Sequence, residues 1–359
     1  GTCIMLTAIA SLIIMVVATM AARPLLELLN TPDSILDWCT SYLRILFLGA
    51  AGLAYYNILS GVLRGLGDSM SALLYLLVAS GLNIVLDLLF VVKFDMGVNG
   101  VALATAIAQG ISAVLCVRRL SKLTELFDLK WKYIRLNKQH ARNIIRLGVP
   151  SGVTQAMISM AMLIVQSLTN SFGEQFIAAN VITMRVDGFA MLPNMSFGNA
   201  MTTYAGQNVG ANQYERVFKG AKQGLFMGVG TSAVITGLIL IFGKPLMGIF
   251  TSTSELVDLS YHLMQILAVG YLVMSVTQVL SGIMRGAGDT MTPMWISIVQ
   301  TIVIRVPLAY LLVYASRSAA FPQGKREYIY LSLVISWVIG ALITTFFYKR
   351  GKWKTKAIK

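Results

Sequence analysis

One motif occurs twice in the chain, first as Ser60-Gly61-Val62-Leu63-Arg64-Gly65-Leu66-Gly67-Asp68 and then, 221 residues later, as Ser281-Gly282-Ile283-Met284-Arg285-Gly286-Ala287-Gly288-Asp289. The similarity extends outward from this motif. Between residues 24 and 68, 13 of 45 positions are identical to their counterparts at the same offset. The matched pairs include Pro24 with Pro245, Asp37 with Asp258 and Gly49 with Gly270. Self-similarity at a fixed offset indicates a duplicated structural unit.

The composition around this repeat is that of a membrane protein. The 359 residues are 56% hydrophobic and only 12% charged, with a mean hydropathy of +0.72. A membrane-spanning helix needs about 20 apolar residues. Ten runs of roughly this length occur, at 4–22, 41–63, 71–92, 98–117, 150–170, 177–203, 223–242, 259–283, 293–315 and 328–348. The sequence therefore predicts an all-α membrane protein.

The repeat sets the expected domain organisation. We predict an N-lobe at 1–120, a basic cytoplasmic linker at 121–142, a C-lobe at 143–348 and a basic cytoplasmic tail at 349–359. The C-lobe holds six runs and the N-lobe four, so we expect two further spans upstream of residue 1. The fold class is then two pseudo-symmetric six-helix bundles, with ten of twelve helices present. Because six is even, both bundles enter the membrane in the same orientation, which makes the repeat parallel.

The positive charge, +14 overall, follows the membrane topology. If the connection 118–146 is cytoplasmic, the inner segments hold 20 of the 29 Lys and Arg residues, the outer segments six and the spans three. This bias predicts that both ends of the chain are cytoplasmic. We expect a multi-pass protein of the cell (cytoplasmic or inner) membrane, with the lipid bilayer rather than nucleic acid as its partner.

Two acidic residues, Asp87 and Asp187, lie well inside predicted spans, where a charge costs about 2.5–3.5 kcal/mol on insertion scales. Asp87 lies one helical turn after Asn83, on the same face. A carboxylate and an amide oxygen in this arrangement can share a cation, or the carboxylate can take a proton. Thr105 on the next span can complete such a cation-binding site. The alternative is a polar pair that stabilises helix packing.

A second set of residues, all in the C-lobe, is predicted to line the substrate cavity. Its members are polar or flexible side chains within the apolar runs: Gln155, Ser159, Met184, Arg185, Asp187 and Arg305. Polar faces of membrane helices point to protein or water, so packing between helices is the alternative role. Neither histidine, His140 or His262, forms a cluster with acidic residues at membrane depth, so no catalytic residue and no enzymatic activity are predicted.

The two repeated loops are predicted to be structural and gating elements. Their glycines permit a tight turn, and their aspartates can cap the helix that follows. The residues concerned are Arg64, Gly65, Gly67, Asp68, Arg285, Gly286, Gly288 and Asp289. The pattern has no Walker Gly-Lys-Ser/Thr, so direct ATP drive is not expected. We predict no cofactor, and no metal beyond a possible coupling Na⁺.

Together these motifs resemble the multidrug and toxic compound extrusion (MATE) family. The resemblance rests on the two loops and on five further segments: Asn83-Ile84-Val85-Leu86-Asp87, the stretch 97–105, Leu147-Gly148-Val149-Pro150, Met191-Leu192-Pro193 and the stretch 204–211. It implies export of amphiphilic or cationic compounds by alternating access, with substrate between the two bundles and an inward flow of H⁺ or Na⁺ as the driving force. It also implies that Asn83 and Asp87 belong to the cation site.

A close alternative is a flippase for lipid-linked oligosaccharides in the same superfamily. Such a protein needs a more cationic cavity, whereas only Arg185 and Arg305 lie deep in the second half. The antiporter is therefore the leading hypothesis, and we expect it to be a monomer.

Overall fold

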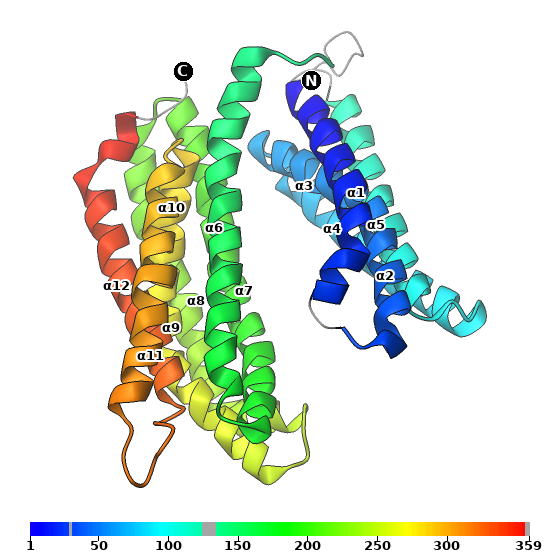
Figure 1. Ribbon diagram of the computed structural model, residues 1–359. Helices are drawn as coiled ribbons and strands as arrows, with labels where there is room; N and C mark the ends of the chain where they lie inside the picture. Colours follow the sequence, from blue (N-terminus) through cyan, green and yellow to red (C-terminus); the bar gives the residue numbers. More distant parts are fainter. Residues whose placement is uncertain (29–30, 124–133, 356–359) are drawn as a thin grey trace. The chain divides into compact units, whose positions relative to one another are not determined.

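The computed structural model describes residues 1–28, 31–123 and 134–355, and the chain divides into two compact units (Figure 1). Unit 1 is Gly1–Ile144 and unit 2 is Ile145–Lys359. The division lies close to the start predicted for the C-lobe. Within the predicted linker and tail, residues 124–133 and 356–359 lie outside the described residues.

Unit 1 consists of helices along its described length. They are α1 (Thr2–Leu28), α2 (Asp33–Leu48), α3 (Ala50–Gly65), α4 (Ser69–Leu88), a π-helix (Leu89–Lys93) and α5 (Gly97–Lys122). Unit 2 contains most of α6 and all later elements. These are α6 (Lys138–Asn170), α7 (Glu174–Gly210), α8 (Tyr214–Gly248), α9 (Ser254–Gly286), α10 (Met291–Ile298), a π-helix (Val299–Arg305), α11 (Val306–Ala315), α12 (Tyr328–Arg350) and a short 3-10 helix (Lys352–Thr355).

Within the described residues nine helices are long and apolar enough to cross a membrane, and a bent pair, α2 with α3, makes a tenth. These ten match the ten runs in the sequence, which confirms the prediction of an all-α membrane protein. The span predicted at 41–63 differs in shape, because it is bent by 40° where α2 meets α3, at Gly49. A Cβ atom at Gly52 would lie 2.8 Å from the backbone nitrogen of Gly110, so glycine lets α3 and α5 approach closely.

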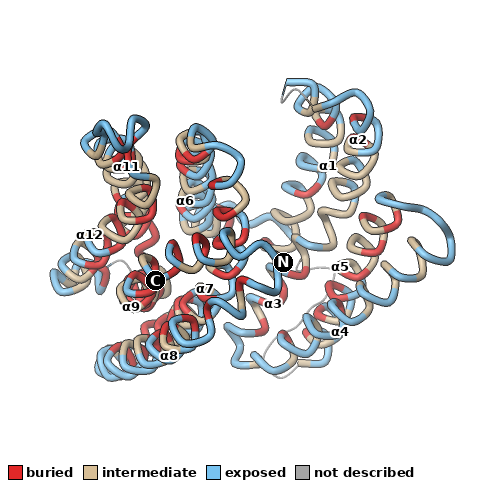
Figure 2. Tube along the Cα trace, turned by 90° about the horizontal axis from the view of Figure 1, so that it is seen from below, coloured by how far each residue is buried: buried red, intermediate tan, exposed pale blue. Residues whose placement is uncertain are grey.

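Burial differs strongly between helices. Only 6% of the most apolar window is buried in α1 and in the α4 span, compared with 61% in α9. Figure 2 shows exposed residues along α4 and α8, whereas buried residues surround α9. Large exposed apolar side chains such as Leu74, Val85 and Phe226 are suited to contact with lipid chains. α9 is therefore the central helix of unit 2, packed mainly against α7, α8 and α12.

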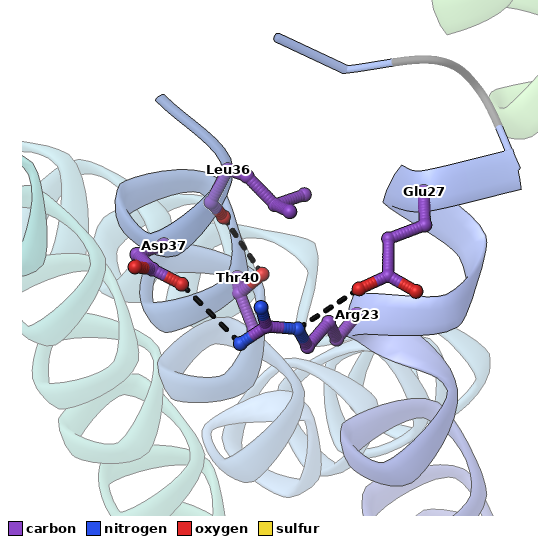
Figure 3. Close-up of polar contacts among 5 residues, drawn as sticks. All are labelled: Arg23, Glu27, Leu36, Asp37 and Thr40. Atoms are coloured by element: carbon purple, nitrogen blue, oxygen red, sulfur yellow. Dashed lines mark hydrogen bonds and ion pairs between the residues drawn. The ribbon is translucent and has the colours of Figure 1, made fainter. Parts of the chain in front are cut away.

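The internal repeat is visible in matched ion pairs. Arg23 Nη1 lies 3.3 Å from Asp37 Oδ1, which links α1 to α2, while its Nε donates to Glu27 (Figure 3). At the repeat offset, Lys244 Nζ lies 2.6 Å from Asp258 Oδ1 and links α8 to α9. The two halves thus use a cation and an aspartate at equivalent positions to join equivalent helices.

Candidate functional site

A polar cluster in unit 1 joins α4 to α5. Asn83 Nδ2 lies 3.5 Å from Asp87 Oδ1 and 3.4 Å from Thr105 Oγ1. Thr105 Oγ1 in turn donates to the carbonyl of Val101 at 3.0 Å. The three side chains are half-buried. The structure therefore brings together the three residues predicted to form the cation site, which we call the unit 1 cluster.

The surroundings of the unit 1 cluster add a further oxygen atom. On α5, Gln109 Oε1 is buried without a hydrogen-bond partner among the described residues. Gln109 lies one turn after Thr105. Immediately after Asp87 and Leu88 the helix changes to the π-helix Leu89–Lys93. Such π segments are rare and frequently mark functional sites. Carboxylate and amide oxygens suit a hard cation, and the carboxylate alone suits a proton.

Unit 2 encloses a cavity of about 590 Å³, within the usual range for small-molecule sites. Its lining comes from α6, α7, α9, α10, α12 and the π-helix Val299–Arg305. Four of the six residues predicted to line a substrate cavity do so: Gln155, Met184, Asp187 and Arg305. We call this space the unit 2 cavity. It lies wholly within unit 2.

The other two predicted residues lie outside the lining. Ser159 is exposed and lies beside the lining stripe of α6, which includes Gln155, Ile158 and Met162. Arg185 is also exposed, and its guanidinium carbon lies 5.7 Å from the centre of the Phe250 ring. Helical spacing placed both residues on a polar face, but spacing alone does not say which neighbour a face meets.

Hydrogen bonds between side chains of different helices stabilise one end of the cavity. The buried Tyr271 hydroxyl donates to Asp187 Oδ1 at 2.8 Å, joining α9 to α7. Tyr330 on α12 donates to Asn180 Oδ1 at 2.6 Å. Arg305 interacts electrostatically with Asp187, although its Nε has no hydrogen-bond partner among the described residues. Asp187 is therefore fixed by its neighbours rather than free in the cavity.

Several of these residues were not singled out from the sequence. Asn180, Tyr271 and Tyr330 come from three helices, and Tyr271 is 84 positions from Asp187. The available signal was the seven-residue interval between Asn180 and Asp187, which places both on one helical face. Arg285, predicted as a loop residue, also lines the cavity.

The two repeated loops have nearly identical geometry. Gly67 and Gly288 have φ angles of 92° and 90°, a region that favours glycine. The amides of Asp68 and Asp289 each donate across the loop at 2.9 Å, to Leu63 and Met284 respectively. These bonds close the preceding helix in the manner of a Schellman motif.

Asp68 is the N-cap of α4, as predicted, and Asp289, one residue before the N-cap Thr290 of α10, likewise accepts a hydrogen bond from the first turn of the following helix. Asp68 Oδ1 accepts from the Ser71 amide at 3.1 Å, and Asp289 Oδ1 accepts from the Thr292 amide at 3.2 Å. Asp68 also binds Arg119 Nε at 2.7 Å. Burial raises the pKa of Asp68, but the hydrogen bonds from Arg119 and Ser71 outweigh it and leave the pKa below its ordinary value. A gating role for the loops stays a prediction.

Comparison with known proteins identifies the family. The MatE family model matches residues 1–89 and 150–311, which is more than half of the chain. The chain belongs to the MatE family. Members of this family are transporters, so this MatE protein is a membrane transporter and not an enzyme.

Relatives of this MatE protein are named as drug exporters. It is 31% identical over 336 residues to the probable multidrug resistance protein YpnP of Bacillus subtilis (strain 168), covering 92% of this chain and 72% of that protein. The fold matches an outward-facing multidrug resistance MATE family transporter with a TM-score of 0.89 and 22% identity, over 97% of this chain and 76% of that one. A transporter of the MOP superfamily from Pyrococcus furiosus, described as having a binding pocket of reversed polarity, matches equally well, with the same TM-score, identity and coverages. The family thus supports drug extrusion as the general activity.

Proposed function

We propose that this transporter is an antiporter that exports amphiphilic or cationic compounds in exchange for H⁺ or Na⁺. The observation that supports the proposal is the unit 1 cluster, where Asp87 lies within hydrogen-bonding distance of Asn83, which also contacts Thr105 on the neighbouring helix. Asp87 is the coupling residue, and Asn83 and Thr105 position it and supply oxygen ligands.

The coupling follows from the cost of charge in a membrane. A carboxylate at membrane depth costs about 2.5–3.5 kcal/mol on insertion scales. Binding of a proton or of Na⁺ removes the net charge, so the loaded and empty forms of Asp87 stabilise different conformations. A ligand shifts such an equilibrium by its difference in affinity for the two states. Loading from outside and release inside then drive substrate in the opposite direction.

The driving force is sufficient for export. One charge that moves through 100 mV releases about 2.3 kcal/mol. At about 1.36 kcal/mol per factor of ten, this sustains a gradient of roughly 50-fold for a substrate without net charge, whereas a monovalent cation exchanged for one ion is driven by the concentration gradient of that ion alone. One coupling ion per cycle is therefore enough for useful efflux.

The expected substrates follow from the relatives and from the cavity. YpnP is named as a multidrug resistance protein, which favours drug-like compounds over the lipid-linked oligosaccharides of a flippase. Six methionines line the unit 2 cavity: Met162, Met184, Met191, Met195, Met274 and Met294. Flexible thioether side chains adapt to ligands of different shape.

The proposal includes an orientation. Because 20 of the 29 basic residues lie in the segments assigned to the inside, both ends of this chain lie in the cytoplasm. The protein crosses the cell membrane as a monomer. A reporter enzyme that is active only in the cytoplasm, fused after Lys359, should be active. A fusion active only outside the cytoplasm would overturn this assignment.

One transport experiment tests the function and identifies the ion. Vesicles that contain the protein are loaded with a fluorescent amphiphile, and a pH gradient and a Na⁺ gradient are imposed separately. Export that responds to one of the two gradients supports the antiporter. Export that responds to neither gradient but needs ATP would contradict it.

A further inference from the structure

The side chains that line the unit 2 cavity carry more positive than negative charge. Among its described lining residues the charged side chains are Asp187, Arg305 and Arg285, which leaves one excess positive charge. Asp187 interacts with Arg305 and accepts a hydrogen bond from Tyr271. Tyr271 precedes Arg285 by 14 residues on the continuous helix α9, about 21 Å at 1.5 Å per residue. Asp187 therefore cannot neutralise Arg285.

Arg285 is a partly buried arginine without a hydrogen-bond or ion-pair partner among the described residues. No hydrogen bond or ion pair joins its guanidinium to another described residue, although it lies in the last turn of α9 and lines the cavity. The C-terminal end of a helix favours a cation, but only weakly at exposed sites. Arg285 is only partly buried, so its guanidinium is open to the cavity for charge-assisted hydrogen bonds. A negatively charged group is the natural complement.

Hydroxyl groups continue from Arg285 along the same face of α9. Ser281 and Thr277 precede it at four-residue intervals, and all three line the cavity. Thr277 is 8% exposed, and its Oγ1 is buried without a hydrogen-bond partner among the described residues. Ser281 is 6% exposed. Helical side chains lean toward the N-terminus, so the Arg285 side chain leans toward Ser281.

We propose that Arg285, Ser281 and Thr277 form a subsite for the carboxylate of an amphiphilic substrate. The guanidinium and the two hydroxyls donate to the two oxygens of the carboxylate, and the apolar body of the substrate lies against Met274, Met294 and neighbouring methionines. Substrates with a carboxylate, including zwitterions, are then preferred over esters of the same skeleton. This inference rests on the proposed export function, because it names the class of compound exported.

The test uses two dyes with one skeleton. Rhodamine 110 has a free carboxylate, and rhodamine 123 is its methyl ester. The affinity of the purified protein for each dye is measured by fluorescence polarisation, and the difference between the two affinities gives the contribution of the carboxylate. Hydrogen bonds to charged groups are strong enough that Arg285→Gln should weaken rhodamine 110 binding about tenfold. Rhodamine 123 binding should change less than about twofold, because its ester has no negative charge to pair with Arg285. Thr277→Val should weaken rhodamine 110 selectively, by about threefold.

Matched variants outside the cavity act as controls. Arg185→Gln removes an exposed arginine and is the control for Arg285→Gln. Ser159→Ala removes an exposed hydroxyl and is the control for Ser281→Ala. Arg285→Lys retains the positive charge and should keep part of the preference for rhodamine 110. Equal losses for both dyes, or a loss with Arg185→Gln as large as with Arg285→Gln, would overturn the subsite. If Arg285→Gln does not fold, Thr277→Val still decides the question.

A lipid phosphate is an alternative source of the negative charge, and one further measurement separates the two. In nanodiscs of phosphatidylglycerol and of phosphatidylcholine, wild-type affinity for rhodamine 110 should be similar. Competition by phosphatidylglycerol that disappears in Arg285→Gln would assign the site to a lipid and contradict the proposal. Because binding is measured without a gradient, it is independent of coupling: failure of ion-driven export would leave this result intact, and failure of the subsite would leave the antiporter intact.

Discussion

Asn83 Nδ2 lies 3.5 Å from Asp87 Oδ1 and contacts Thr105 on the next helix, so a single amide links the acidic residue of α4 to α5. This arrangement gives Asp87 a fixed position and leaves the carbonyl oxygen of Asn83 available to a cation. A displacement of α4 against α5 would change the contact directly. The unit 1 cluster is thus a place where ion binding and helix position can be coupled.

Asn83→Ala should weaken coupling without loss of the fold. The substitution removes the amide that orients Asp87, so we expect the concentration of H⁺ or Na⁺ needed for half-maximal export to rise about tenfold, the effect of roughly one charge-assisted hydrogen bond. Initial rates of dye export at a series of ion concentrations measure this. Asn57→Ala is the matched control, because Asn57 is exposed and its amide donates to Leu53 of its own helix. Equal effects of the two variants would argue against a role for Asn83.

Asp68→Ala should lower the stability of the protein. Loss of an N-cap costs about 1 kcal/mol, and the ion pair with Arg119 is lost as well. Asp68→Asn should be milder, because asparagine still caps the helix. The apparent melting temperature in detergent measures both. A melting temperature for Asp68→Ala equal to that of the wild type would show that the cap is not needed.

The contribution of Asp68 should also depend on pH. Its folded pKa lies below the ordinary value of 3.8, so its stabilising effect is present above that value and is lost as the pH falls through the folded pKa. The difference in melting temperature between wild type and Asp68→Ala should therefore be constant near neutral pH and shrink below about pH 4. A difference that grows on acidification would contradict the ion-pair assignment.

Gly282→Ala should destabilise unit 2. A Cβ atom at this position of α9 would collide with the carbonyl oxygen of Gly198 on α7, and backbone atoms cannot move aside cheaply. Overpacking of this kind costs about 1–3 kcal/mol. Gly230→Ala on α8 is the control, because nothing lies within 4 Å of the added atom. Thermal unfolding should show a lower melting temperature for Gly282→Ala alone, and equal values would argue against close α7–α9 packing.

Tyr271→Phe tests the support of Asp187. The variant leaves the aromatic ring in place but removes the hydroxyl that donates to Asp187 at 2.8 Å. Loss of a hydrogen bond to a charged group should cost about 1.5–3 kcal/mol of stability. Tyr310→Phe removes an exposed hydroxyl with a longer bond of 3.4 Å and should have little effect. If thermal unfolding is unchanged in Tyr271→Phe, Asp187 does not depend on this bond.

The fold was largely predictable because long apolar runs have few alternatives in a membrane. The bend at Gly49 was not, because Gly49 lies against Ala106 of α5, a contact between helices that the sequence does not show. Its counterpart Gly270 lies in an unbroken helix, against Trp337, although both glycines occupy the same repeat position. Identical residues in two repeats therefore need not give identical backbones.

Contacts between residues on one helix could be predicted from the sequence, whereas contacts between different helices could not. The pairing of Asn83 with Asp87 follows from a four-residue interval on one helix, and the structure brings the two together. The bond between Asp187 and Tyr271 joins two helices, so its register could not be deduced from helical spacing. For the same reason helical spacing did not show that Ser159 and Arg185 lie outside the lining of the unit 2 cavity, and their role at the substrate stays a prediction.

The most direct test of the central claim measures rhodamine 123 accumulation in everted membrane vesicles that contain either the wild-type protein or Asp87→Asn at equal amounts. Asp95→Asn is the matched control, because Asp95 is exposed and its φ of 50° is one that asparagine also adopts. With the gradient that drives the wild type imposed, Asp87→Asn should lose nearly all accumulation while Asp95→Asn retains it. Undiminished, gradient-driven accumulation by Asp87→Asn would contradict the role of Asp87 in coupling.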